Sequence, residues 1–235
     1  MKLIRRIIGL IAVSLAVSIV VFPWVAPQAS AQTVLDSVGD LLTSASIPST
    51  DRVLAAFTLG LSAGTLSAED ALLVTDRIVQ SGGLTADKEA VLVALATTLE
   101  QALPVERLID KVIEGISRRV PLSAIRFEIE LRARLQAGVR DLLFSKGIFA
   151  GGSASAGGTS LPQHRFDLLV MHISDALGDY REGGGSPLDY PAVYLAVEQR
   201  LTYLGGSVIQ MADVELALSR IEPAELGAIL LGALA

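Results

Sequence analysis

Apolar residues recur at intervals of three and four along most of the chain, the spacing typical of helices with one buried face. Short segments that contain glycine or proline separate these stretches and leave little room for long connections. Across residues 50–146 this pattern predicts helices over residues 50–62, 67–80, 86–102, 104–118 and 121–146. Short connections favour antiparallel packing, so we expect an all-α fold that is an array of short antiparallel helices, paired as helical hairpins.

Local signals mark where several of these helices begin. Ser67, with Asp70 three residues later, resembles a capping box, because the hydroxyl can accept a hydrogen bond from an orphan backbone amide. The nearby acid also favours the positive end of the helix. Thr85 is expected to cap the next helix. Pro104 and Pro121 suit first helical turns, where a missing N–H costs nothing.

Residues 125–135 satisfy two periods at once. They alternate between apolar and polar side chains, which is the pattern of a β-strand. On a helix, however, Glu128 with Arg132 and Glu130 with Arg134 form acid-to-base pairs four positions apart. Glutamate, arginine, alanine and leucine are also good helix formers. We therefore expect a helix here, with a strand as the alternative.

Residues 150–160 contain no side chain larger than threonine and are typical of a flexible linker. They predict a boundary between an N-terminal helical domain, residues 32–149, and a C-terminal helical subdomain, residues 161–235. Beyond the linker we expect helices over residues 163–180, 189–204, 211–219 and 223–234. The last of these carries a single charge and is expected to be buried or bound to a partner. It is too short to span a bilayer.

Residues 1–31 have the layout of a secretory signal peptide. Three cationic side chains precede a run of sixteen residues without a charged side chain, and prolines then follow. Ala29, Ser30 and Ala31 form an extended small-residue site, so we expect cleavage before Gln32 and export to the bacterial periplasm or the extracellular space. The alternative is a retained N-terminal membrane anchor, because the apolar run extended to residue 26 has about the length of a spanning helix.

Composition and charge narrow the functional classes. The chain has no cysteine, which excludes a disulfide framework, a thiolate zinc site and a cysteine nucleophile. Removing residues 1–31 takes away three of the 19 basic side chains and none of the 25 acidic ones, which leaves a net charge of −9. We expect no nucleic-acid partner for an exported chain of this charge, since phosphate neutralisation supplies most of that affinity.

Within residues 32–235, basic side chains gather in residues 104–147, the one segment of that part with a net positive charge. One interpretation is a solvated helical face laced by ion pairs such as Glu114 with Arg118. The other is a patch for anionic lipid headgroups, for an acidic partner or for the acidic halves of the same chain. We therefore include a membrane surface, reached through residues 104–147, as a second possible partner.

The chain has two histidines, His164 and His172. An aspartate follows each of them three residues later, at Asp167 and Asp175, which resembles a repeated ligand pair. On a helix both histidines fall on the same side as Asp175 and Asp179, opposite the apolar side chains, so we interpret them as the exposed face of an amphipathic helix. The histidines lie about 12 Å apart along the axis, too far to hold one ion together. We expect no metal site here.

Other chemical motifs are weak or missing. Residues 152–159 share part of the spacing of a phosphate-binding loop, but glycine stands at Gly158, where the loop needs lysine. No Gly-x-Ser-x-Gly or Ser-x-x-Lys motif is present. Asp70, Glu89 and Glu114 are candidates for a carboxylate pair, although none stands out from an ordinary surface acid. The sequence therefore assigns no catalytic residue, cofactor-binding residue or metal ligand.

All four tyrosines lie in the last third of the chain, close to a second glycine-rich loop over residues 183–185. Core packing is the ordinary role of such residues. A peptide- or glycan-binding surface is the alternative, because tyrosine and adaptable glycine loops together make contact area at low entropic cost. These residues are Tyr180, Tyr190, Tyr194 and Tyr203.

Residues 103–116 read LPVERLIDKVIEGI, and residues 120–125 read VPLSAI. This arrangement of two proline-started helices, with a Lys-x-x-Glu-Gly core in the first, resembles that of uncharacterised exported bacterial all-helical proteins over about residues 50–148. The resemblance implies an extracytoplasmic all-helical module. It implies no activity, ligand or catalytic residue.

Together these features favour an exported non-catalytic helical protein that acts in the bacterial envelope as an interaction or structural module, with a protein as its partner. One alternative is a membrane-surface or anchored protein that binds anionic lipid. The other is a small extracytoplasmic enzyme with a carboxylate or histidine site built on His172 and Asp175, in which the glycine-rich loops act as lids.

Overall fold

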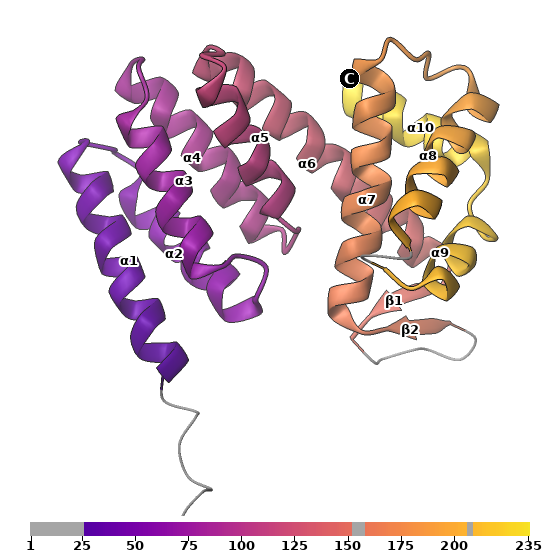
Figure 1. Cartoon of the computed structure of the whole chain (residues 1–235), viewed down its shortest axis with the longest axis horizontal. Coiled ribbons are helices and arrows are strands. Elements are labelled where there is room, and N and C mark those ends of the chain that lie inside the picture. The colour runs from indigo at the N-terminus through magenta and orange to yellow at the C-terminus, as the bar shows by residue number, and fades with distance from the viewer. Residues whose placement is uncertain (1–25, 152–157, 206–208) are drawn as a thin grey trace, which may run out of the picture.

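The computed structural model describes residues 26–151, 158–205 and 209–235 (Figure 1). These residues form ten helices and one short two-stranded sheet, so the expected all-α fold is confirmed. The elements in chain order are α1 (Ala26–Ser44), α2 (Thr50–Ala63), α3 (Ala68–Gln80), α4 (Thr85–Glu100), α5 (Glu106–Ser117), α6 (Leu122–Ser145), β1 (Ile148–Ala150), β2 (Thr159–Leu161), α7 (Gln163–Glu182), α8 (Tyr190–Gly205), α9 (Met211–Leu218) and α10 (Pro223–Leu234).

The first six helices form three hairpins that stack side by side in two layers. α1 packs against α3 and α3 against α5 in one layer, while α2 packs against α4 and α4 against α6 in the other. Figure 1 shows the stack as the indigo-to-rose half of the molecule. The expected array of helical hairpins is therefore confirmed for this half, and its geometry is that of a short helical solenoid, in which each hairpin contacts its neighbours.

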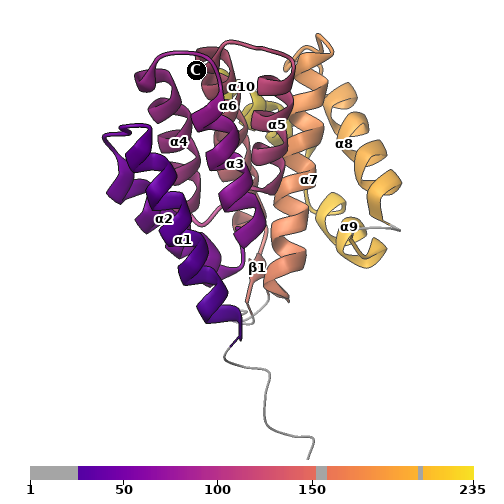
Figure 2. The same cartoon turned by 60° about the vertical axis from the view of Figure 1, so that its left-hand side comes forward.

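The last four helices, α7–α10, form the second part of the fold. α7 packs against α6 on one side and against α8 on another, and Figure 2 shows it between the hairpin stack and α8. α9 contacts α7 and α8, and α10 packs against α6 and α8. The C-terminal helix, which the sequence leaves nearly without charge, is therefore partly buried through residues such as Leu226 and Leu230.

Buried apolar side chains form two clusters. The first runs from Val38 to Ile129 and the second from Leu131 to Ala233. Both Ile129, the last residue of the first cluster, and Leu131, the first residue of the second, lie on α6. The buried apolar side chains of α6 from Leu131 to Leu143 therefore belong to the second cluster, while Ala133 packs against the first.

The glycine-rich segment expected to be a linker begins and ends in strands. β1 and β2 pair in parallel, with Ile148 opposite Thr159. The backbone N–H of Thr159 donates to the carbonyl of Gly147 at 2.7 Å, and that of Gly151 to the carbonyl of Leu161 at 3.0 Å. Strands of three residues are too short to produce a recognisable period, so the sequence did not predict them. Residues 152–157, with most of the partial phosphate-loop pattern, lie outside the described residues.

From α2 onward, each helix begins and ends within two residues of its expected position. The residues expected to cap or start these helices agree with the structure only in part. The hydroxyl of Ser67 accepts the N–H of Asp70 at 3.0 Å, as expected. Thr85 is the first residue of α4 rather than its cap, and Leu84 holds the cap position without a side-chain hydrogen bond. Pro104 lies two residues before α5 begins.

α6 passes through residues 125–135, so the helical interpretation of this segment is correct. The Glu128–Arg132 ion pair forms at 2.7 Å, whereas Glu130 pairs with Arg126 at 3.4 Å instead of with Arg134. The strand-like alternation has a physical cause. α6 packs against α4, α5, α7 and α10, so apolar side chains are needed on more than one of its faces.

α1 is a helix that the sequence pattern did not predict. It begins at Ala26 and includes Pro27 in its first turn, where proline is tolerated because that N–H has no helical partner. The small-residue site at residues 29–31 is therefore helical rather than extended. Residues 1–25, which hold most of the expected signal peptide, lie outside the described residues. Among the described helices, none combines the length and apolar character needed to cross a membrane.

Candidate functional site

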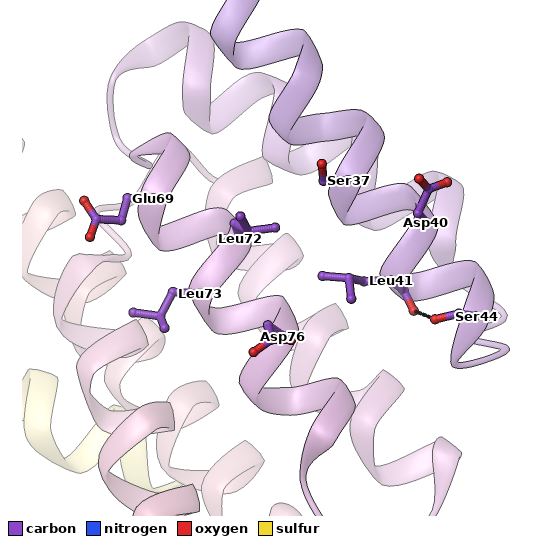
Figure 3. Close-up of a pocket in the computed structure, with 8 residues that line it drawn as sticks. All are labelled: Ser37, Asp40, Leu41, Ser44, Glu69, Leu72, Leu73 and Asp76. Carbon is purple, nitrogen blue, oxygen red and sulfur yellow. Dashed lines mark hydrogen bonds between the residues drawn. The ribbon is translucent and has the colours of Figure 1, made fainter.

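A groove lies over the exposed face of α3 and its seam with α1, and we call it the α1–α3 groove (Figure 3). Its volume is about 760 Å³. Figure 3 shows Leu41 of α1 and Leu72 of α3 directed toward each other across the seam. The groove is lined by Ser37, Asp40, Leu41, Ser44, Glu69, Leu72, Leu73 and Asp76.

The groove exists because α3 carries apolar side chains on two faces. Ala71, Val74 and Ile78 are buried in the N-terminal cluster, while Leu72 and Leu73 are each 37 % exposed. A single exposed leucine is ordinary on a protein surface. Leu72 faces Leu41 across the seam, whereas Leu73 points away from α1 on the other side of α3 (Figure 3). Together these leucines line the groove with apolar surface, which is the kind of surface that marks interaction sites.

Three carboxylates stand beside these leucines, from Asp40, Glu69 and Asp76. Asp76 accepts a hydrogen bond from the amide of Gln80. Among the described residues, none of the three carboxylates forms an ion pair, and no cationic side chain lines the groove. The apolar floor therefore has an uncompensated negative rim.

A second unusual feature lies in the interior, on the face of α7 that the sequence assigned to solvent. Every residue from Leu169 to Gly178 is buried, including His172, which is fully buried, and Asp175, which is 7 % exposed. The prediction of an exposed polar face is therefore wrong for this part of the helix. The reason is that α7 packs between α6 and α8, whereas His164, at its first turn, is exposed as expected.

Arg132 of α6 faces this part of α7, and its side chain is only 2 % exposed. Its Nε lies 2.7 Å from Glu128 Oε1, and its Nη1 lies 3.4 Å from Asp175 Oδ1. Its Nη2 contacts the carboxylate of Glu182 and lies 3.6 Å from Asp179 Oδ1. One buried guanidinium thus meets four carboxylates from two helices.

Three more arginines balance these carboxylates. Arg107 of α5 lies 3.8 Å from Asp175, Arg181 of α7 lies 3.7 Å from Glu128, and Arg200 of α8 lies 3.5 Å from Asp179. Four guanidinium groups and four carboxylates therefore connect α5, α6, α7 and α8. We call this set the Arg132 network: Arg107, Glu128, Arg132, Asp175, Asp179, Arg181, Glu182 and Arg200.

Gly178 of α7 makes room for the guanidinium of Arg132. A Cβ atom at this position would lie 2.8 Å from Arg132 Nη1 and 3.0 Å from its Cζ, closer than side chains normally approach. Any other residue would therefore push against a group held by several carboxylates. The glycine is a packing requirement of the network.

Charges in the network depend on one another. Burial opposes the charge on Arg132, but Glu128, Glu182 and Asp175 outweigh it, so the pKa of Arg132 is raised. Burial also raises the pKa of Asp175, and the charges of Arg132 and Arg107 offset part of that increase. Removing either partner of such a pair leaves an uncompensated charge in the interior, which destabilises a fold strongly.

His172 has no hydrogen-bond partner for either ring nitrogen within the described residues. Burial, followed by the positive charges of Arg107 and Arg200, lowers its pKa to about 4. The imidazole is therefore neutral at neutral pH. A substrate would have to open the helix packing to reach it, so this geometry gives no support to the enzyme alternative built on His172 and Asp175.

The remaining sequence candidates lie apart from one another in local structural roles. Asp70 accepts the hydroxyl of Ser67 at 2.7 Å at the start of α3. Glu89 accepts the hydroxyl of Ser49, and Glu114 pairs with Arg118 at 2.8 Å. In the part of the chain that the structure describes, no three histidine or acidic side chains are grouped so that they could hold a metal ion.

The tyrosines do not share one surface. The hydroxyl of Tyr194 donates to the carbonyl of Leu218 at 3.0 Å, and its ring packs against the C-terminal cluster. The hydroxyl of Tyr180 donates to the carbonyl of Ser186 at 3.3 Å. Tyr203, in contrast, is 83 % exposed. At least two of the four therefore serve packing.

Comparison with models of protein families, with curated proteins and with solved structures gave no match. The resemblance of residues 50–148 to exported bacterial all-helical proteins therefore stays a prediction. The two structural features that bear on function are the α1–α3 groove and the Arg132 network. The sequence pattern indicated the Glu128–Arg132 pair of the network, but neither the groove nor the burial of that pair.

Proposed function

We propose that this chain is an exported, non-catalytic helical protein of the bacterial envelope that acts by binding a protein partner, and that the α1–α3 groove is its binding surface. The observation that carries the proposal is the groove itself. It joins exposed leucines to carboxylates that form no ion pair with another described residue. Stacked helical hairpins are well suited to this role, because they present extended surfaces along the array.

Export is supported by the signal-like layout of residues 1–31, and it is compatible with the groove. Cleavage after Ala31 removes only the first six residues of α1 and leaves Gln32–Ser44. All four groove residues from α1 lie within that remaining part. The same binding surface is therefore available in the processed chain and in a chain that keeps its N-terminal segment.

Charge pairing makes the lipid-surface alternative less favourable. Seven of the nine basic side chains in residues 104–147 lie within 4.0 Å of a carboxylate. One of the seven, Arg132, is buried among several carboxylates. Paired cations attract anionic headgroups less strongly than free ones. The seven are Arg107, Lys111, Arg118, Arg126, Arg132, Arg140 and Lys146.

The proposal is tested by site-specific photo-crosslinking in intact cells of the bacterium that makes the protein. A photoreactive residue is placed at Ser37 or Ser44 in the groove, and at Ser219 beyond the end of α9 as the matched control. We expect one discrete protein adduct from both groove positions and none from Ser219, on a chain whose N-terminus is Gln32 by mass spectrometry. No groove adduct, or the same adducts from Ser219, would contradict the proposal.

A further inference from the structure

We infer that the occupant of the α1–α3 groove is a helix of the partner protein that inserts apolar residues between α1 and α3 and carries lysine or arginine on either side of them. The inference rests on the proposed function, and it specifies the chemistry of the partner. It is drawn from the length of the groove, from the charges on its rim, and from the burial of the apolar side chains of the basic helices α5 and α6.

The groove has the length of two helical turns. Its lining residues run from Ser37 to Ser44 on α1 and from Glu69 to Asp76 on α3, a span of seven residue steps on each wall. At 1.5 Å per residue each wall measures about 10 Å. Anchor residues at positions i, i+3 or i+4, and i+7 of a bound helix span the same distance. The groove therefore matches a short amphipathic helix with two or three anchors.

The rim selects the charge of that helix. Asp40 and Glu69 are exposed carboxylates, Asp76 is half-buried, and none of them has a cationic partner among the described residues. At physiological ionic strength charges interact over about 8 Å, so side chains that flank the apolar anchors fall within reach of the rim. Acidic flanks and anionic headgroups are repelled, whereas lysine and arginine are attracted. Complementary charge of this kind increases the association rate and the specificity.

A second copy of the chain fits this groove less well than a basic helix does. A two-fold dimer places the same patch on both sides of the interface, so carboxylates would face carboxylates. Of the basic helices of another copy, α5 buries Leu108 and Val112 in its own core. α6 buries Ile129, and its exposed phenylalanines, Phe127 and Phe144, lie seventeen positions apart rather than on one continuous apolar stripe. A separate protein is therefore the occupant that the charges favour.

The inference is tested with two synthetic helical peptides of about 18 residues, long enough to form a helix on binding. Both carry the same leucines at i, i+4 and i+7, and they differ only in lysine or glutamate at the flanking positions. Fluorescence anisotropy measures their binding to the full chain. We expect the lysine peptide to bind at least about ten-fold more tightly than the glutamate peptide, with a preference that shrinks as salt is added.

Matched variants locate the binding. Asp40→Asn with Glu69→Gln should weaken the lysine peptide several-fold, while Glu198→Gln with Glu215→Gln removes two exposed charges elsewhere and should leave binding unchanged. Leu72→Ser should abolish binding. The control for that change is Leu59→Ser on α2, because Leu59 is 54 % exposed and lies outside the groove.

The outcomes separate this inference from the proposed function. Equal binding of both peptides, lost in Leu72→Ser, would overturn the inference about charge and leave the groove as a binding surface. Failure of both peptides would overturn the inference, while the crosslinking experiment judges the proposed function independently. Dimerisation of the chain that Leu72→Ser abolishes would assign the groove to a second copy. A crosslink from Ser37 to residues 1–25 of the same chain would assign it to that segment, and either result would overturn the inference.

Discussion

Replacing Arg132 by methionine removes the central charge of the Arg132 network and keeps a long side chain in its place. Four carboxylates lose a guanidinium, but they lose it unequally. Glu182 and Asp179 are nearly half exposed, so water replaces the contact at a cost of about 0–1 kcal/mol each. Glu128 keeps Arg181 at 3.7 Å. Most of the effect therefore falls on Asp175.

Asp175 has a side chain that is 9 % exposed, and without Arg132 the ion pair that it keeps among the described residues is with Arg107, at 3.8 Å. Leaving one member of a buried pair without its partner costs about 3–5 kcal/mol. We expect Arg132→Met to lower the free energy of unfolding by this amount. The matched control is Arg126→Met on the same helix, where both partners of the Arg126–Glu130 pair are nearly half exposed, and the expected loss is below about 1 kcal/mol.

Urea unfolding followed by circular dichroism measures both variants, and a double-mutant cycle isolates the interaction. Adding Asp175→Asn to Arg132→Met removes the stranded charge, so the double variant should be more stable than Arg132→Met alone by at least about 1 kcal/mol. If Arg132→Met is as stable as Arg126→Met, or if the second change gives no recovery, the buried charges are not coupled as described.

Two further predictions concern α7. The pKa of His172 is about 4 in the fold against 6.5 when unperturbed, so the unfolded chain binds more protons between these values and stability falls as the pH drops from about 6.5 to 4. The free energy of unfolding of His172→Leu relative to that of the parent should therefore rise by up to about 3 kcal/mol as the pH falls over this range. Urea unfolding at pH 7 and pH 4.5 measures this difference. A difference that does not change with pH would contradict the reasoning. Gly178→Ala drives a Cβ into the guanidinium of Arg132 and should cost about 1–3 kcal/mol in thermal unfolding. Gly232→Ala on α10, where a Cβ meets nothing within 4 Å, should instead be neutral or stabilising.

Local periodicity was enough to predict most of the helical array, because short helices with one buried face repeat their apolar residues at every turn. α1 was missed because residues 26–31 fit two descriptions. Pro27 and the small residues 29–31 suit the end of a signal peptide, and they also suit a first helical turn. The spacing of Leu35, Val38 and Leu42 already contained the helical signal.

The burial of the polar face of α7 could not be predicted from the local spacing of apolar and polar residues. Glu128 and Arg132 have the same spacing on an exposed helix as in the interior, and only the packing of α7 against α6 and α8 decides between the two. One sequence signal was available in Gly178, three residues after Asp175. A glycine inside a helical pattern costs stability and often indicates a close approach by another group.

The groove was equally hard to predict, since it depends on where the hairpin stack leaves a face uncovered. Ala71, Leu72, Leu73 and Val74 are four consecutive apolar residues, more than one helical face can bury. Such a run indicates either two packed faces or one packed and one open face. Only the position of α1 and α5 relative to α3 distinguishes these cases.

The two features lie in different parts of the fold, and this separation makes the proposed function testable. The groove is formed by α1 and α3, while the Arg132 network connects α5, α6, α7 and α8. Network variants should change the free energy of unfolding and leave peptide binding intact in the folded fraction. Groove variants such as Leu72→Ser remove a partly exposed side chain and should change binding with little effect on stability. If instead stability and binding always changed together, the groove would owe its leucines to the fold rather than to a partner.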